Sequence, residues 1–171
     1  APEPAPAASA PAPETAPPAA PAVPGTASAV LKPTAGSNVA GTLQFMSMDG
    51  KVHVTGTLTG LSPGQHGFHI HEKGDCSAAD GSSAGGHFNP DHVDHGQVSA
   101  TPHHAGDSNN IVADAQGNAS VDNLLSDNVH LGGGDDHDIL GKAVIVHADA
   151  DDYKTQPTGN AGGRLACGVI Q

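Results

Sequence analysis

A long polar segment, residues 72–109, places the strongest constraint on how this chain can fold. It is a run of Gly, Asp, Ser, His and Pro with almost no apolar periodicity. A loop of this length inside a compact domain is uncommon unless something other than a hydrophobic core orders it. The chain carries 12 histidines, and imidazoles together with carboxylates are metal ligands. The segment therefore predicts a loop that is ordered by bound metal.

Short β-strands separated by turns are predicted on both sides of this loop. The expected strands are 26–31, 39–47, 51–58, 65–71, 110–114, 119–125, 142–148 and 164–170. Apolar and β-branched residues mark them, and Asp49-Gly50 is a hairpin signal between the second and the third. About eight strands with no helix longer than a turn predict an all-β, eight-stranded antiparallel barrel or sandwich with long metal-binding loops.

Residues 1–25 differ from the rest of the chain, because they are almost wholly Ala, Pro, Glu, Ser and Thr. With almost no large apolar side chain to bury, such a segment cannot offset the entropy lost on ordering. It is expected to be a disordered, partly polyproline tether. The folded part is then residues 26–171, a length suited to one domain.

Charge and chain ends limit the partners. Six basic and 18 acidic residues give a net charge of −12, which disfavours nucleic acid, and no apolar run is long enough to cross a bilayer. The sequence starts at Ala1 without a signal-like region, so a signal peptide has been removed or the chain was trimmed. In the second case a lipidated cysteine upstream of residue 1 is compatible with an Ala/Pro tether. The two cysteines fit one disulfide in an oxidising, extracytoplasmic compartment.

Two different metal sites are suggested by the ligand types. His69 and His71 lie two apart on a predicted strand, so both side chains project from one face. His147 ends the strand 142–148, from which a third imidazole can approach. An imidazole-only site with an open position suits copper. In the polar loop, three imidazoles and a carboxylate make the closed tetrahedral set of a structural zinc. The loop residues are His87, His95, His104 and Asp107.

Two sequence motifs carry a family resemblance. Residues 67–75 (GFHIHEKGD) and 159–170 (GNAGGRLACGVI) resemble the two signatures of the copper/zinc superoxide dismutases. Between them GHFNP at 86–90, HG at 95–96, HAGD at 104–107 and VH at 146–147 follow the family's order. Cys76 follows His71 by five residues, and this spacing resembles that of the bacterial, periplasmic branch of the family. Members of this family have a Greek-key, immunoglobulin-like sandwich fold, so the same fold is expected here.

The resemblance implies a role for each site residue. His87 would bridge the two metals, and Asp151 would link a copper ligand to a zinc ligand as an outer carboxylate. Cys76 and Cys167 would form the disulfide, and Arg164 would hold the anionic substrate beside copper. The implied copper ligands are His69, His71, His87 and His147. The implied zinc ligands are His87, His95, His104 and Asp107.

Neighbouring histidines compete for two of these positions. His103 competes with His104, but only His104 is followed by Ala-Gly-Asp. His92 competes with His95, and Gly96 favours His95. His66 resembles a structural histidine that bonds the backbone. The other histidines, His53, His130 and His137, are expected on strands or loops at the surface.

The implied activity is conversion of superoxide to dioxygen and hydrogen peroxide by alternating reduction and oxidation of a His-ligated copper. Structural zinc would share His87, which would also pass a proton to the forming peroxide. The enzyme would protect against extracytoplasmic superoxide. Two other readings are a metal-delivery protein on the same scaffold and an adhesin-like sandwich with incidental histidines. The alternatives of monomer and homodimer both stay open.

Overall fold

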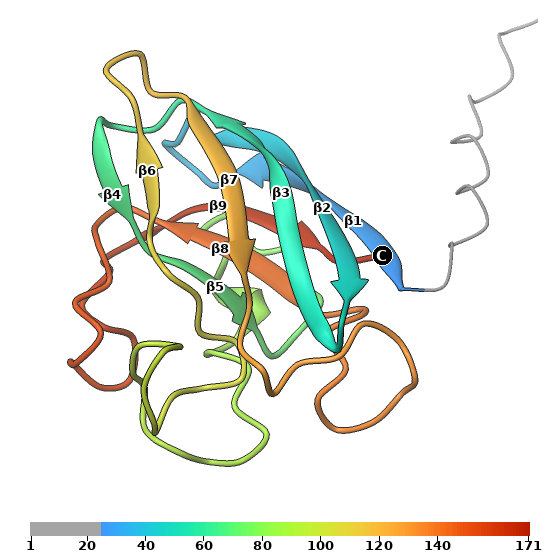
Figure 1. The fold of residues 1–171 in the computed structure, drawn as a ribbon. Coiled ribbons are helices and arrows are strands. Elements are labelled where there is room, and N and C mark those ends of the chain that lie inside the picture. The colour runs from blue at the N-terminus through green and yellow to red at the C-terminus, as the bar shows by residue number, and fades with distance from the viewer. Residues whose placement is uncertain (1–24) are drawn as a thin grey trace, which may run out of the picture.

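The computed structural model describes residues 25–171, and every regular element in that range is a strand except for one short 3₁₀ turn (Figure 1). The predicted leader therefore lies outside the described residues, apart from Gly25. The elements are β1 Thr26–Pro33, β2 Ala40–Met48, β3 Lys51–Thr59, β4 Gly64–His66, β5 Phe68–His71, η1 Ser82–Ala84, β6 Ile111–Ala113, β7 Ala119–Leu124, β8 Ala143–His147 and β9 Arg164–Val169.

The strands form one antiparallel sheet that curls into a nearly closed barrel. Their order is β4-β6-β7-β3-β2-β1-β9-β8-β5. In Figure 1 the strands β4, β6, β7, β3, β2 and β1 make the near wall, and β5, β8 and β9 cross behind them. The predicted all-β antiparallel fold is confirmed, with nine strands where eight were expected.

The ninth strand arises at Gly67, inside the segment 65–71 that was predicted to be a single strand. β4 pairs with β6 on one wall, whereas β5 pairs with β8 on the other. The chain changes walls at Gly67, whose N–H donates to Asp149 O and whose C=O accepts from His147 N, each at 2.8 Å. A Cβ at this position would lie 2.8 Å from Ala161 Cβ. Only glycine fits this corner without displacing its neighbours.

The β2–β3 hairpin closes at the predicted Asp-Gly turn. Asp49 and Gly50 have φ values of 52° and 78°, as a tight hairpin turn with two left-handed residues requires. The register places Met48 opposite Lys51 and Met46 opposite His53. Alternate side chains of both strands therefore point into the barrel or to the solvent.

The core lies between the two walls of the barrel. Its largest fully buried side chains include Phe45 of β2, Leu58 of β3, and Phe68 and Ile70 of β5. Each such side chain contributes about 1.5–3 kcal/mol when it is removed from water. Ile70 lies between His69 and His71 in sequence, and alternation along β5 directs it to the opposite side of the strand.

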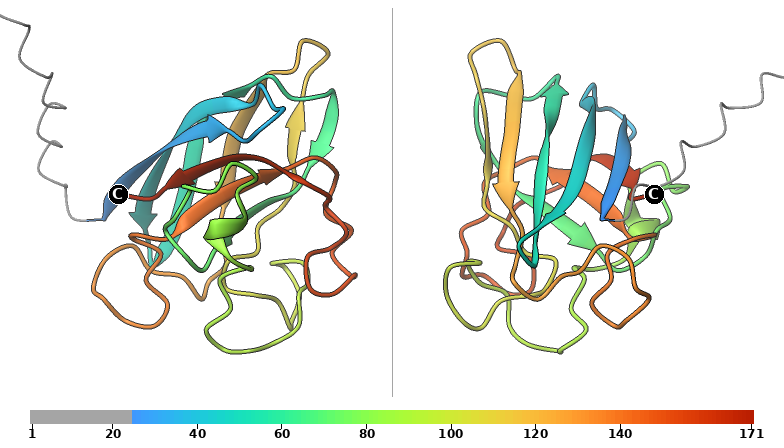
Figure 2. Two further views of the ribbon diagram at one scale, coloured as in Figure 1. Left: turned by 180° about the vertical axis from the view of Figure 1, so that it is seen from behind. Right: turned by 45° about the vertical axis from the view of Figure 1, so that its right-hand side comes forward.

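β8 is buried on both faces. Its inner face joins the core, and its outer face packs under the loop that contains η1. Seen from behind in Figure 2, this loop lies over β8 and β9. The disulfide between Cys76 and Cys167 ties the loop to β9 across a sequence separation of 91. Within residues 25–171, no helix is long and apolar enough to cross a membrane.

Candidate metal centre

One group of four buried histidines gathers at the ends of β5 and β8. The group is His69, His71, His87 and His147, and one nitrogen from each lies within 4.8 Å of the others. His71 Nε2 is 3.4 Å from His147 Nε2. The loop histidine, His87, reaches this group because it forms an isolated β-bridge with His71. Strand pairing and one bridge therefore assemble an all-imidazole site.

The outer ring nitrogens of this group bond to oxygen atoms. His69 Nε2 donates to Asp151 Oδ2 at 2.6 Å, His71 Nδ1 to the carbonyl of Gly85 at 2.9 Å, and His147 Nδ1 to the carbonyl of Gly162 at 3.4 Å. A proton on each outer nitrogen leaves the lone pair on the inner one. The group therefore presents inward-facing donors to one point.

A second group lies on the other side of His87. It consists of His87, His95, His104 and Asp107, all buried and within the same 4.8 Å limit. His87 Nδ1 lies 3.1 Å from both His104 Nδ1 and Asp107 Oδ1. His95 Nδ1 lies 2.7 Å from Asp107 Oδ1. Three imidazoles and one carboxylate form the set expected of structural zinc.

Backbone N–H groups orient Asp107. Its Oδ2 accepts hydrogen bonds from the N–H of His104 at 2.7 Å and from that of Gly96 at 3.2 Å. The other oxygen, Oδ1, is left facing the ring nitrogens. Burial opposes ionisation, but the hydrogen bonds from His87 and His95 dominate and hold the pKa of the Asp107 carboxyl well below its usual range. Asp107 is thus a fixed carboxylate.

Two buried ring nitrogens indicate that these groups bind metals. His69 Nδ1 and His87 Nε2 have no hydrogen-bond partner within the described residues. An unpaired buried polar atom is costly, at about 1–3 kcal/mol. Both atoms face the all-imidazole group, where a metal would accept their lone pairs. The donor set therefore fits copper on one side of His87 and zinc on the other.

Without metal, these groups predict a stability maximum near neutral pH. Burial lowers the pKa of His69 to about 4, below the value of about 6.5 in an unfolded chain. As pH falls from about 6.5 to 4, the unfolded chain binds a proton that the folded one does not, and the fold loses roughly 3 kcal/mol. Burial also lowers the pKa of His95, but bonds to Asp107 and Asp151 outweigh it and raise that pKa to about 9. The stability that protonated His95 adds to the fold is fully present below pH 6.5 and is lost as pH rises through 9.

The measurement is urea unfolding of the metal-free protein from pH 4 to 10. The free energy of unfolding should be largest near pH 6.5 and fall on both sides. A curve that keeps rising up to pH 9 would contradict the assignment of His95. A flat curve between pH 6.5 and 4 would contradict that of His69.

Asp151 connects the two groups from outside. Its Oδ2 accepts from His69 Nε2 at 2.6 Å and its Oδ1 from His95 Nε2 at 2.7 Å. The side chain of Asn110 holds the backbone of Asp151. Asn110 Oδ1 accepts from the N–H of Asp151 at 2.9 Å, and Asn110 Nδ2 donates to the C=O of Asp151 at 3.0 Å. The predicted link between the groups is present, and the clamp by Asn110 was not predicted.

Gln156 is a second residue that the sequence analysis missed. Its Oε1 accepts from the N–H of His95 at 2.6 Å, and its Nε2 donates to the C=O of His95 at 2.8 Å. The side-chain amide thus imitates a neighbouring strand and fixes the backbone of a candidate zinc ligand. A lone amide in a polar loop gives no signal in sequence, since its partner is 61 positions away.

Gln156→Ala is expected to weaken zinc binding by about 10-fold, because outer partners orient metal ligands. Competition with a chromophoric zinc chelator measures the affinity. Gln116→Ala is the control, since that side chain lies in an exposed turn between β6 and β7. Equal affinities in the two variants would show that the amide does not position His95.

Arg164 lies beside the all-imidazole group. It starts β9 opposite His147 in the β8–β9 register. Its guanidinium is half-buried and donates to Gly81 O at 2.8 Å and to Gly85 O at 2.6 Å. The carbonyl of Gly85 also accepts from His71. Arg164 is therefore fixed to the same loop as a candidate copper ligand and keeps further N–H donors for an anion.

The competing histidines belong to neither of the two groups. His103 bonds the carbonyl of Ala100 and the hydroxyl of Ser126, while His92 is exposed. His66 is buried, and its two ring nitrogens lie 2.9 and 2.7 Å from the carbonyls of His147 and Ser62. The structure thus brings His104 and His95 to the second group, and it gives His66 the backbone contacts that were predicted.

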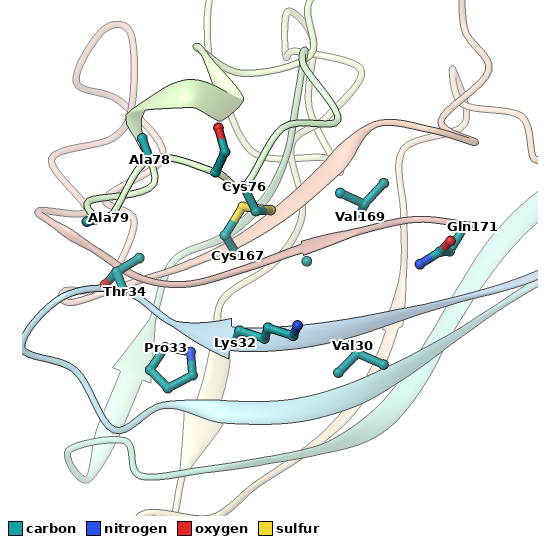
Figure 3. A pocket seen from close by; sticks show the side chains of 12 residues that line it. Val30, Lys32, Pro33, Thr34, Cys76, Ala78, Ala79, Cys167, Val169 and Gln171 are labelled. Atoms are coloured by element: carbon teal, nitrogen blue, oxygen red, sulfur yellow. A yellow bond between two sulfur atoms is a disulfide. The ribbon is translucent and has the colours of Figure 1, made fainter. Parts of the chain in front are cut away.

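Two cavities differ in their relation to the histidines. One of about 400 Å³ is lined by His87, His104 and Gln156 among others. A larger groove of about 610 Å³ runs between β1, β9 and the disulfide loop. Figure 3 shows Lys32, Val169 and the Cys76–Cys167 disulfide along its wall. None of the candidate metal ligands lines the larger groove, so cavity size does not locate the chemistry here.

The comparison with known families decides what this arrangement belongs to. The sequence profile described as copper/zinc superoxide dismutase (SODC) matches residues 39–170. The chain belongs to the copper/zinc superoxide dismutase family. As such an enzyme it converts superoxide to dioxygen and hydrogen peroxide, with copper and zinc as its cofactors. The predictions of family, enzyme class and both cofactors are confirmed.

Curated relatives and a solved structure agree with this membership. Superoxide dismutase [Cu-Zn] 2 of Mesembryanthemum crystallinum is 46% identical over 149 residues, covering 83% of this chain and 93% of the relative. Extracellular superoxide dismutase [Cu-Zn] of Brugia pahangi is 42% identical over 154 residues, covering 85% and 75%. The crystal structure of the clock protein EA4 superimposes with a TM-score of 0.76 at 46% identity, covering 86% of this chain and 94% of that one.

Proposed function

We propose that this dismutase holds copper with His69, His71, His87 and His147, and zinc with His87, His95, His104 and Asp107. The observation that carries the proposal is the position of His87, which belongs to both groups. Its Nδ1 faces the zinc group, and its Nε2, which has no hydrogen-bond partner among residues 25–171, faces the all-imidazole group. One imidazolate ring can therefore serve both ions, while Asp151 fixes a ligand of each.

Bound copper supplies the one-electron reduction and oxidation that turn two superoxide anions into dioxygen and hydrogen peroxide. Arg164 binds and orients each anion, because its planar guanidinium is rigidly held and positive in a chain of net charge −12. Forming hydrogen peroxide takes up two protons. Nε2 of His87 is proposed to hold one of them while it is not bound to copper, since it is buried and has no hydrogen-bond partner in residues 25–171.

Arg164→Ala is expected to lower the rate constant for superoxide by roughly 10-fold or more while copper stays bound, because local positive charge raises capture of an anion by about 10–10³-fold. Pulse radiolysis measures the rate, and metal analysis measures the copper. His147→Ala is expected to lose copper as well as activity. Full activity in the His147 variant would contradict the copper site. A copper-binding Arg164 variant with unchanged activity would contradict the substrate role.

An extracytoplasmic location is proposed for the same protein, with residues 26–171 as the enzyme domain and 1–25 as a tether. The Cys76–Cys167 disulfide and the similarity to an extracellular nematode dismutase support that location. The bacterial, periplasmic branch is supported by Cys76, which follows His71 by only five positions. Fractionation of cells that produce the full precursor tests the location and any lipid anchor. Sedimentation of the purified enzyme distinguishes a monomer from a homodimer.

A further inference from the structure

Both methionines of the chain lie on the solvent side of one strand. The sequence has only two, Met46 and Met48, and they are 48% and 50% exposed on β2. Methionine is among the residues most often buried, so two exposed copies are unusual. Because they are two positions apart in a strand, their side chains project from the same face.

A histidine lies directly opposite Met46 on the next strand. His53 of β3 is the register partner of Met46, so the two Cβ atoms are about 4.5–5.5 Å apart on one face. Met48 is the next residue of β2 on the same face, two positions after Met46. Both thioethers are long and flexible, which brings two sulfurs and one imidazole within reach of a common point.

Asp122 prepares that histidine as a ligand. Its Oδ1 is hydrogen-bonded to His53 Nε2 from the neighbouring strand β7. A proton on Nε2 leaves the lone pair on Nδ1. Asp151 acts in the same way on His69 in the metal centre, and a carboxylate on the outer nitrogen is the usual support of a metal-ligating histidine.

Most outward neighbours of the two methionines are polar, so the methionines do not belong to a broad apolar surface. The outward residues next to them on β2 and β3 are polar, and they include Gln44 and Thr55. Leu124 is the one large apolar neighbour in the register, opposite His53 on β7. Lys51, the register partner of Met48, is paired with Asp127 at 3.4 Å. Two thioethers and one imidazole, with Asp122 on its outer nitrogen, form a soft ligand set.

We propose that Met46 Sδ, Met48 Sδ and His53 Nδ1 form a surface site for Cu(I), separate from the dismutase centre. Thioether ligands select Cu(I), and imidazole binds copper as well. Hard cations such as Mg²⁺ and Ca²⁺ prefer oxygen ligands and are not expected here. The proposal depends only on the outer face of β2, β3 and β7, and not on the assignment of the inner ligands.

The test uses the copper- and zinc-loaded enzyme with ¹³C-labelled methionine methyl groups, reduced and kept free of oxygen. Single variants Met46→Leu and Met48→Leu assign the two methyl signals. On titration with Cu(I) supplied as its acetonitrile complex, both signals should shift together and saturate at one added equivalent. Signals that do not move, or a shift of only one of them, would overturn the proposal.

Two further variants separate this site from unspecific binding. Asp122→Asn is expected to weaken the titration by about 10–100-fold, as loss of an outer carboxylate does, and His53→Phe should weaken it at least as much. His130→Phe is the control, since His130 is exposed and, like His53, is paired with a carboxylate, at 3.8 Å from Asp135. An equal loss in the His130 variant, or none in the His53 variant, would refute the site.

Discussion

His87→Ala is expected to weaken the binding of both copper and zinc and to lower dismutase activity by about 100-fold or more. Losing an outer partner of a metal ligand already costs about 10–100-fold in affinity or activity, and His87 is proposed as a direct ligand on two sides. Its Nδ1 lies 3.1 Å from Asp107 Oδ1, and within the described part of the chain its Nε2 has no hydrogen-bond partner. Metal analysis after dialysis against a chelator measures both affinities, and pulse radiolysis measures the rate.

The control for this variant is His92→Asn. His92 lines the same cavity as His87 but is exposed, and asparagine tolerates the positive φ of 53° at that position. The control should keep both metals and full activity. If His87→Ala released copper and kept zinc at the affinity of the unchanged enzyme, the ring would not be shared between the two sites.

Removing the disulfide is expected to produce the largest loss of stability. In the chain-entropy account, a bond that closes a loop of about 90 residues stabilises the fold by about 4–5 kcal/mol. The Cys76→Ser/Cys167→Ser double variant should therefore lose about that much in urea unfolding of the metal-free protein. Its activity should fall too, because Cys76 anchors the loop whose carbonyls at Gly81 and Gly85 hold Arg164.

The matched control is the unchanged sequence after reduction of its disulfide. It carries the same open loop without a substitution, so its unfolding curve should agree with that of the double variant. A loss of less than about 1 kcal/mol in both would contradict the loop-closure argument. A loss in the double variant alone would assign the effect to the serines.

The strands and the candidate metal ligands were predictable from sequence, because the strands depend on local patterns and the candidates on residue type. Alternation predicted that His69 and His71 share a face, and Asp49-Gly50 marked the turn that the structure has. The mixture of imidazoles and a carboxylate separated a copper set from a zinc set by ligand chemistry alone. The resemblance in residues 67–75 and 159–170 then predicted the family, which the match over 39–170 confirms.

Other features were beyond the sequence, since they depend on contacts between distant segments. The corner at Gly67 splits a predicted strand, because the space there is set by Asp149 and Ala161 from the far end of the chain. Asn110 and Gln156 gave no local signal, although each holds a backbone segment of the metal centre through two hydrogen bonds.

The sequence by itself determined which atoms could bind metal and along which strands some of them would lie. The tertiary structure decided that the loop histidines reach those strands at all. No periodic pattern directs residues 72–109, so their path follows from the β-bridge of His71 with His87, the disulfide and the side-chain amide of Gln156. Local propensity acts over a few residues, whereas closing this loop requires partners that only the folded chain brings within hydrogen-bonding distance.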